Sequence, residues 1–137
     1  MVVTDCAIGR QIMSTDGARN LLVSNRNAPV GALSINAVDQ LRAIAGLCNA
    51  GEFDATTKHL PLHLRKIHGD ATDQAILRFA ETLEPIEDLK RSWSTKFDLA
   101  FNSKNKFMMR VLGMTNPSGL ATALPGSVAT VFEPRDM

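Results

Sequence analysis

The hexapeptide Phe-Asn-Ser-Lys-Asn-Lys at residues 101–106 lies between two segments in which apolar and polar residues alternate, and this stretch decides the fold. The segment before the turn is Lys-Phe-Asp-Leu-Ala-Phe at residues 96–101, and the segment after it runs from Lys106 to Leu112. Alternation with a period of two is typical of a β-strand, and a short polar stretch between two such segments is typical of a hairpin turn. Residues 96–112 therefore predict a β-hairpin with its polar turn at residues 102–105.

Helices are predicted upstream of this hairpin. Ser34 is a suitable N-cap, and the apolar residues that follow it at spacings of three and four predict a helix that ends near Asn49. Asp70 is a suitable cap for a second helix, which carries the acidic Asp73 in its first turn. This helix is expected to stop before Pro85, and a shorter helical piece is expected over residues 85–93.

The other segments complete an α+β domain. Residues 1–8 are rich in β-branched types and predict a strand, and residues 128–132 predict a last strand. Residues 14–33 and 115–127 contain many turn-forming and small residues and are predicted as loops. We therefore expect a single domain over residues 1–137, built as an antiparallel sheet with two main helices packed on it.

Composition excludes several classes of function. The 137 residues include 15 Lys plus Arg and 14 Asp plus Glu, which gives no reason to expect a nucleic acid bound by bulk charge. Aromatic residues make up only 5% and do not alternate with basic ones. No apolar run approaches the roughly 18 residues that span a bilayer, and two cysteines suggest a reducing compartment. We expect no nucleic-acid partner and no direct membrane contact by this chain.

Motifs for catalysis and metal binding are weak. His59, His63 and His68 are close in sequence, but Pro61 interrupts the helix that would present two of them on one face. The Gly-rich stretch after residue 113 lacks the Gly-Lys-Ser/Thr ending of a P-loop. No nucleophile elbow is visible, although spacing alone leaves a Ser/His/Asp or Cys/His set open. We assign no catalytic residue and no metal site.

The hexapeptide 101–106 resembles the Phe-Asn-Ser-x-Asn-Lys segment in the nucleotide-binding domain of P-type ATPases, the sodium/potassium pump branch in particular. Gly-Leu-Cys-Asn at residues 46–49 is similar to the family's helix that ends in Leu-Cys-Asn, and residues 69–75 are similar to its Gly-Asp-x-Ser/Thr-Glu-x-Ala segment. Residues 1–3 resemble the strand that follows the family's phosphorylated Asp-Lys-Thr-Gly-Thr-Leu-Thr motif. The four markers come in the family's order and cover nearly the whole chain.

The resemblance implies an ATP site at four positions. Phe101 would be the platform on which adenine stacks, an interaction of about 1–3 kcal/mol. Lys106 would lie beside the base and reach toward the phosphates with its cation. Asp73 stands where the family has a Glu that hydrogen-bonds the adenine amino group, and it is one methylene shorter. Met108 matches a pocket-lining position that is Gln in sodium/potassium pumps and Met in calcium pumps.

The resemblance also implies a parent protein. That parent would couple ATP hydrolysis, through an aspartyl phosphate and Mg²⁺, to cation transport, with Na⁺ or K⁺ favoured and Ca²⁺ or H⁺ left open. Its phosphorylation and actuator domains and its membrane helices would be the partners, and the domain would lie on the cytoplasmic face. The phosphorylated motif and the Lys-Gly-Ala-Pro-Glu segment are absent. We therefore expect a partial domain, truncated before that segment, which binds ATP without being catalytic alone.

Each site residue also has a structural explanation that needs no ligand. Phe101 and Met108 are compatible with core packing, and Lys106 with a solvated charge beside a strand. Asp73 occupies the third helical position after a cap, where a carboxylate favours the helix dipole. An alternative function is an interaction module that keeps the fold and has lost nucleotide binding. A third is a small enzyme or metal protein built on the histidines.

Overall fold

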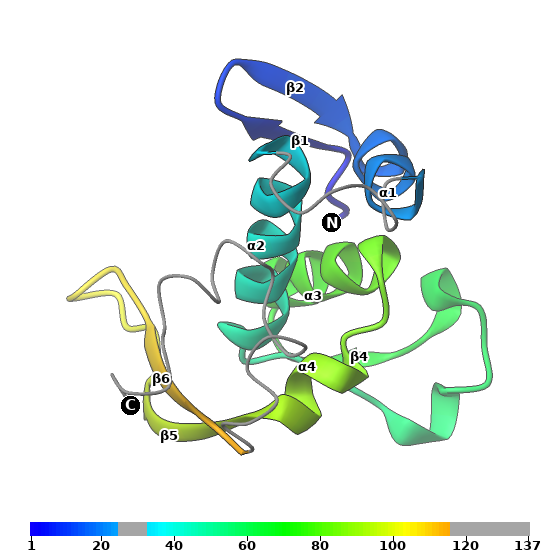
Figure 1. Ribbon diagram of the computed structural model, residues 1–137. Coiled ribbons are helices and arrows are strands. Elements are labelled where there is room, and N and C mark those ends of the chain that lie inside the picture. The colour runs from blue at the N-terminus through cyan, green and yellow to red at the C-terminus, as the bar shows by residue number, and fades with distance from the viewer. Residues whose placement is uncertain (25–32, 116–137) are drawn as a thin grey trace.

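The computed structural model of the chain describes residues 1–24 and 33–115 (Figure 1). The elements follow in the order β1 (Asp5–Ile8), β2 (Gln11–Ser14), α1 (Thr15–Ser24), α2 (Leu33–Leu47), β3 (Glu52–Phe53), β4 (Ile67–His68), α3 (Ala71–Leu83), α4 (Glu87–Ser92), β5 (Trp93–Leu99) and β6 (Met109–Met114). The predicted strand at residues 128–132 and all but the first residue of the predicted loop at 115–127 lie outside the described residues. The α+β class expected from the sequence is confirmed.

The central packing is between α2 and α3, which cross in the middle of the molecule, with α1 against both (Figure 1). The core between these helices includes Leu22 from α1, Val38 from α2, and Leu77 and Leu83 from α3, all at most 1% exposed. Burying a side chain of this kind stabilises a fold by about 1.5–3 kcal/mol. The helices predicted to begin near Ser34 and after Asp70 are therefore present and form the body on which the rest is built.

Helix α1 corrects the loop that was predicted over residues 14–33. Residues 15–24 are helical because the Ser14 hydroxyl accepts a hydrogen bond from the Gly17 main-chain N–H at 3.0 Å, which caps the first turn. Ala18 and Leu22, four residues apart, are at most 1% exposed and face the core. The polar composition of the segment hid this narrow apolar stripe.

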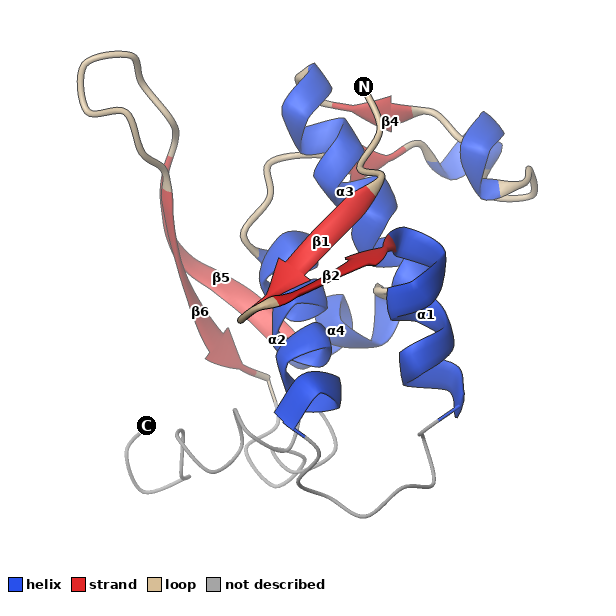
Figure 2. Ribbon diagram, turned by 90° about the horizontal axis from the view of Figure 1, so that it is seen from above, coloured by secondary structure: helices blue, strands red, loops and turns tan. Residues whose placement is uncertain are grey.

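The strands form three separate two-stranded antiparallel sheets rather than the one sheet expected (Figure 2). β1 pairs with β2, β3 with β4, and β5 with β6. The strand predicted at residues 1–8 is confined to Asp5–Ile8. The strands β3 and β4 have only two residues each, which is too short to extend a larger sheet. They therefore form an isolated two-stranded pair.

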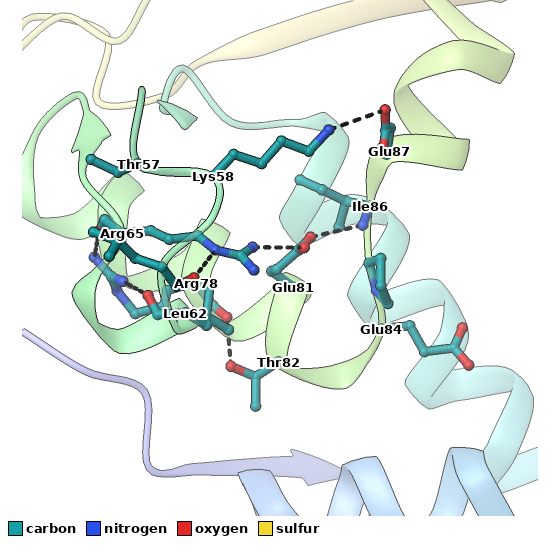
Figure 3. A network of polar contacts seen from close by, with 12 residues as sticks. Thr57, Lys58, Leu62, Arg65, Arg78, Glu81, Thr82, Glu84, Ile86 and Glu87 are labelled. Carbon is teal, nitrogen blue, oxygen red and sulfur yellow. Dashed lines mark hydrogen bonds and ion pairs between the residues drawn. The ribbon is translucent and has the colours of Figure 1, made fainter. Parts of the chain in front are cut away.

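Two turns of 3₁₀-helix, Ala55–Thr57 and Leu62–Leu64, lie between β3 and β4, and arginines attach the second turn and the residue after it to α3 (Figure 3). Arg78 donates to the main-chain carbonyls of Leu62 and of Arg65, the latter at 3.1 Å. Arg65 forms an ion pair with Glu81 at 3.5 Å, and the second carboxylate oxygen of Glu81 accepts from the Ile86 N–H at 2.8 Å. This irregular segment is thus ordered by charge-assisted hydrogen bonds rather than by a core of its own.

The predicted hairpin is present as β5 and β6, and it lies to one side of the helices in both views (Figures 1 and 2). Phe97 is opposite Val111 and Leu99 is opposite Met109, with a register shift between Thr95 and Phe97. The connection runs over residues 100–108, so it is longer than the predicted turn at 102–105. The loop that carries the hexapeptide projects beyond the helical body (Figure 1, yellow).

Candidate functional site

The candidate site is built where the end of α2, the start of α3 and the β5–β6 hairpin meet. Asn49, just after α2, is only 3% exposed. Its side-chain amide donates to the carbonyls of Ala45 at 3.2 Å and Asp73 at 3.1 Å, and its side-chain oxygen accepts from the Gly51 N–H at 2.7 Å. Because every polar atom of this side chain has a partner, Asn49 fixes the first turn of α3 against the end of α2.

Arg110 of β6 joins the hairpin to the same place. Its guanidinium donates to the main-chain carbonyls of Leu47 at 3.1 Å and Asn49 at 2.7 Å, and it donates to the Asp98 carboxylate at 3.3 Å. A cation at the last carbonyls of a helix is also favoured by the helix dipole. Arg110 therefore connects β6, β5 and the end of α2 through a single side chain.

Asp73 lies in the first turn of α3, three residues after its N-cap. The Asp70 carboxylate accepts a hydrogen bond from the Asp73 N–H at 2.8 Å. Partial burial raises the pKa of the Asp73 carboxyl, the charge of Asp70 raises it further, and the Arg110 cation acts in the opposite direction. Within residues 1–24 and 33–115, no hydrogen bond reaches the Asp73 carboxyl oxygens, so they are available as acceptors.

The turn that precedes Asp70 explains the glycine in this motif. Gly69 has φ +139°, a conformation that L-residues with side chains rarely adopt. A Cβ built on Gly69 would also lie 3.1 Å from the Gly51 Cα. The Gly-Asp pair thus places the α3 N-terminus close to the chain that leaves α2.

The hexapeptide 101–106 builds its own turn. The Asn102 side-chain oxygen accepts from the N–H groups of Lys104 at 3.1 Å and Asn105 at 2.8 Å, and the Asn102 carbonyl accepts from the Lys106 N–H at 2.9 Å. Lys106 follows with φ +64°, in the left-handed region. Asn102 alone therefore accepts three hydrogen bonds that shape the loop, and this is the structural role of the motif.

Phe101 is 60% exposed at the start of that loop, which removes the core-packing explanation for its presence. Lys106 is exposed, and Met108 is half-buried just before β6. Among the described residues, no hydrogen bond or ion pair joins the loop 101–106 to Asp73. The loop and Asp73 are linked through β6. Arg110, two residues after Met108, donates to the main-chain carbonyl of Asn49, and the Asn49 side chain donates to the carbonyl of Asp73.

Sequence reasoning missed two of the residues that hold this arrangement together. Asn49 was interpreted only as a helix terminator, although its place at the end of the Gly-Leu-Cys-Asn segment was a usable signal. Arg110 gave no signal beyond being a charged residue between the apolar Met109 and Val111. Its role depends on hydrogen bonds to Leu47, 63 positions away in the sequence, and to Asn49, 61 positions away. No local pattern encodes such long-range contacts.

The chain is thus an α+β domain. Its candidate site lies where the capped N-terminus of α3, the end of α2 and the β5–β6 hairpin meet. The family model described as P-type ATPase, cytoplasmic domain N, matches residues 37–133, and the chain belongs to this family. The matched region contains the whole of the site described above. The resemblance noted for the sequence is thereby confirmed.

The chain is similar to parts of sodium/potassium-transporting and potassium-transporting ATPases. The chain is 30% identical over 95 residues, 69% of its length, to the sodium/potassium-transporting ATPase subunit alpha-A of Artemia franciscana. It is 35% identical over 72 residues, 52% of its length, to subunit alpha-4 of Rattus norvegicus. It is 31% identical over 80 residues, 58% of its length, to the human potassium-transporting ATPase alpha chain 2. These matches cover 10%, 7% and 8% of the three relatives, so the chain corresponds to a small part of each.

In the part of the chain that the structure describes, no helix combines the length and the apolar character needed to cross a membrane.

Proposed function

We propose that this chain is an ATP-binding unit of a cation-transporting P-type ATPase, which holds the nucleotide by its adenine base and does not cleave it alone. The observation that carries this proposal is the 60% exposure of Phe101 on a loop built by its own motif. A large aromatic side chain left out of the core, on a loop that hydrogen bonds keep in shape, is suited to stacking against a planar ligand.

The remaining site residues have complementary roles in this proposal. The Lys106 ammonium supplies a positive charge for the phosphates, and its side chain is exposed on the same loop. The free carboxyl oxygens of Asp73 accept a hydrogen bond from the adenine amino group. Met108, a flexible thioether next to the loop, lines the base from one side.

Mg²⁺ enters with the nucleotide in this proposal. In residues 1–24 and 33–115, no three His, Cys, Asp or Glu side chains lie close enough to hold a metal ion. The described residues therefore offer no ligand set for a resident Mg²⁺, which prefers several oxygen ligands in near-octahedral geometry. In the parent, phosphoryl transfer to an aspartate would belong to the phosphorylation domain on the cytoplasmic face, and cation transport would belong to the membrane helices.

A second candidate function is an interaction module that retains the fold without the ligand. Exposed apolar side chains on the hairpin favour it, since Phe97 is 52%, Met109 43% and Val111 45% exposed. Asp73, shorter than the family's Glu, favours it as well. In this case the hairpin face would bind protein rather than a nucleotide.

Titration of the isotope-labelled chain with ATP and with GTP, followed by amide NMR, tests the proposal. We expect shifts centred on Asp73, Phe101 and Lys106 that saturate with ATP. They should be weaker with GTP, because guanine carries a carbonyl oxygen at the ring carbon where adenine carries its amino group. Phe107→Ala is the matched control for Phe101→Ala, because Phe107 lies in the same loop with 52% exposure. A folded spectrum without ATP-dependent shifts would favour the interaction module.

A further inference from the structure

Among the described residues, Arg110 is the side chain whose hydrogen bonds run from β6 to both β5 and the end of α2. Its contacts are directional, because the two carbonyls lie on one nitrogen and the Asp98 carboxylate on the other. A guanidinium has a rigid planar fork of donors, so these partners fix the angle of the group as well as its position. A lysine ammonium in its place could not hold all of them with the same geometry.

The surroundings of Arg110 make this attachment stronger than a surface ion pair. Its side chain is only 17% exposed, so its hydrogen bonds are largely shielded from water, although its Nε, buried without a partner among the described residues, offsets part of the gain. Hydrogen bonds from a charged donor in such a setting contribute about 1.5–3 kcal/mol, and losing them leaves the carbonyls of Leu47 and Asn49 unsatisfied. Truncation of this side chain therefore removes the hydrogen bonds that join the hairpin to the end of α2.

The same connection governs the distance between the two halves of the candidate site. The loop 100–108 belongs to the hairpin, whereas Asp73 belongs to α3 and is tied to Asn49. We propose that Arg110 is a positioning residue, which holds the loop 100–108 in a fixed place relative to Asp73 so that both can contact one base. This inference rests on the proposed function, because it assigns Arg110 a part in nucleotide recognition without contact to the nucleotide.

Electrostatics support the assignment. Burial and the charge of Asp70 raise the pKa of Asp73, and the Arg110 cation opposes them, so Arg110 favours the ionised acceptor. The group that orients the hairpin thus also favours the charge state that accepts a hydrogen bond from an amino group. Asp98 balances part of the Arg110 charge from β5.

Nucleotide affinities of Arg110→Met and Arg42→Met, measured on the folded chain, test the role. Arg42 is a matched control because it is 8% exposed and also donates to two main-chain carbonyls, of Glu84 at 3.3 Å and Pro85 at 2.6 Å. Those carbonyls lie at the opposite end of α3 from Asp73. We expect Arg110→Met to weaken ATP binding about tenfold and to reduce the preference for ATP over GTP. Arg42→Met is expected to lower stability without changing that preference.

Arg110→Lys keeps the proposal testable if Arg110→Met fails to fold. We expect it to recover part of the ATP affinity but not the full ATP preference, since one ammonium replaces the fork. Affinity and preference within about twofold of wild type in a folded Arg110 variant would overturn the assignment. A purely structural role would lower the unfolding free energy and leave the ATP preference unchanged.

Hydrogen exchange without ligand separates a failure of this inference from a failure of the proposed function. Absence of ATP-dependent shifts in the wild type would refute nucleotide binding by this chain. The anchoring by Arg110 is then tested by the exchange rates of the β5 and β6 amides. We expect these rates to rise in Arg110→Met relative to those of the β1–β2 amides, and to stay unchanged in Arg42→Met. Equal exchange in wild type and Arg110→Met would refute the anchoring itself.

Discussion

The side-chain amide of Asn49 donates to the main-chain carbonyl of Asp73 at 3.1 Å, while the Asn49 carbonyl accepts from Arg110 at 2.7 Å. One residue at the end of α2 therefore serves both the α3 N-terminus and the hairpin. The two parts of the candidate site have no strand pairing in common, so their relative position depends on this buried polar junction. Buried polar networks rigidify a structure through their paired members, and here both polar side-chain atoms of Asn49 have partners.

Asn49→Ala is expected to destabilise the chain by about 1–3 kcal/mol, because it leaves the Gly51 N–H and the carbonyls of Ala45 and Asp73 without their partner. Urea unfolding, followed by the fluorescence of Trp93, measures the change. Asn20→Ala is the control, since Asn20 is exposed in α1. Equal losses in both variants would show that the junction does not stabilise the fold.

Phe101→Ala is expected to weaken ATP binding by about 1–3 kcal/mol, the range for base stacking, with little change in stability. Phe97→Ala, also more than half exposed but within β5, is expected to leave binding nearly unchanged. Calorimetric or NMR titration of both variants compares them directly. Equal losses of affinity would refute Phe101 as the stacking platform.

Lys106→Gly separates the conformation of the loop from its charge. Lys106 has φ +64°, which disfavours a residue with a side chain by about 1–2 kcal/mol, and glycine relieves this at the expense of a more flexible unfolded chain. We expect unfolding free energy to be equal or slightly higher, while ATP affinity falls because the cation is lost. Lys104→Gly, in the same turn, is the control for flexibility and charge. A fall in affinity as large in the control would place the effect in the loop backbone rather than in the Lys106 charge.

Gly69→Ala is expected to destabilise the chain by about 1–3 kcal/mol, because alanine is strained at φ +139° and its Cβ would approach the Gly51 Cα to 3.1 Å. Gly9→Ala is an informative comparison, since Gly9 has φ +60° with nothing within 4 Å of its added Cβ. Thermal unfolding of both variants measures how much of the loss comes from the close approach. A smaller loss at Gly69 than at Gly9 would contradict the packing argument.

Local sequence patterns predicted the elements whose signals are local. The Asp70 cap and the Pro85 stop bound α3, and alternation located β5 and β6, because capping and strand period are encoded by neighbouring residues. Helix α1 was missed because only Ala18 and Leu22 mark its buried face. The division into three small sheets depends on which strands meet in space, and periodicity carries no information on that.

The candidate site shows the same limit. The hexapeptide predicted a turn at residues 102–105, and the structure has a longer connection over residues 100–108, in which Asn102 forms hydrogen bonds within the motif. The junction of Asn49, Asp73 and Arg110 joins three elements that are far apart along the chain. The assignment of Asp73, Phe101, Lys106 and Met108 to one ligand remains a prediction that the binding experiments address.

The opposite pKa shifts of two aspartates predict opposite pH effects on stability. Burial first, and then the Asp70 charge, raise the pKa of Asp73 above its ordinary value, so the folded state binds this proton more tightly than the unfolded state. Stability therefore falls as pH rises from the ordinary Asp range through the raised pKa, and Asp73→Asn is expected to increase stability at neutral pH. This gain should shrink as pH falls to about 4 and disappear below it, where Asp73 of the wild type is protonated in both states.

Asp54→Asn is the control of opposite sign. Hydrogen bonds from the Thr56 hydroxyl at 2.7 Å and the Thr56 N–H at 2.9 Å lower the pKa of Asp54, with His68 3.5 Å away as a further favourable charge when protonated. Its contribution is present above the ordinary Asp pKa and is lost as pH falls through the lowered value. Asp54→Asn is therefore expected to destabilise the chain at neutral pH, with the difference shrinking in acid. Urea unfolding of both variants at neutral and acid pH tests the pair, and differences of the same sign at neutral pH would contradict the electrostatic assignment of Asp73.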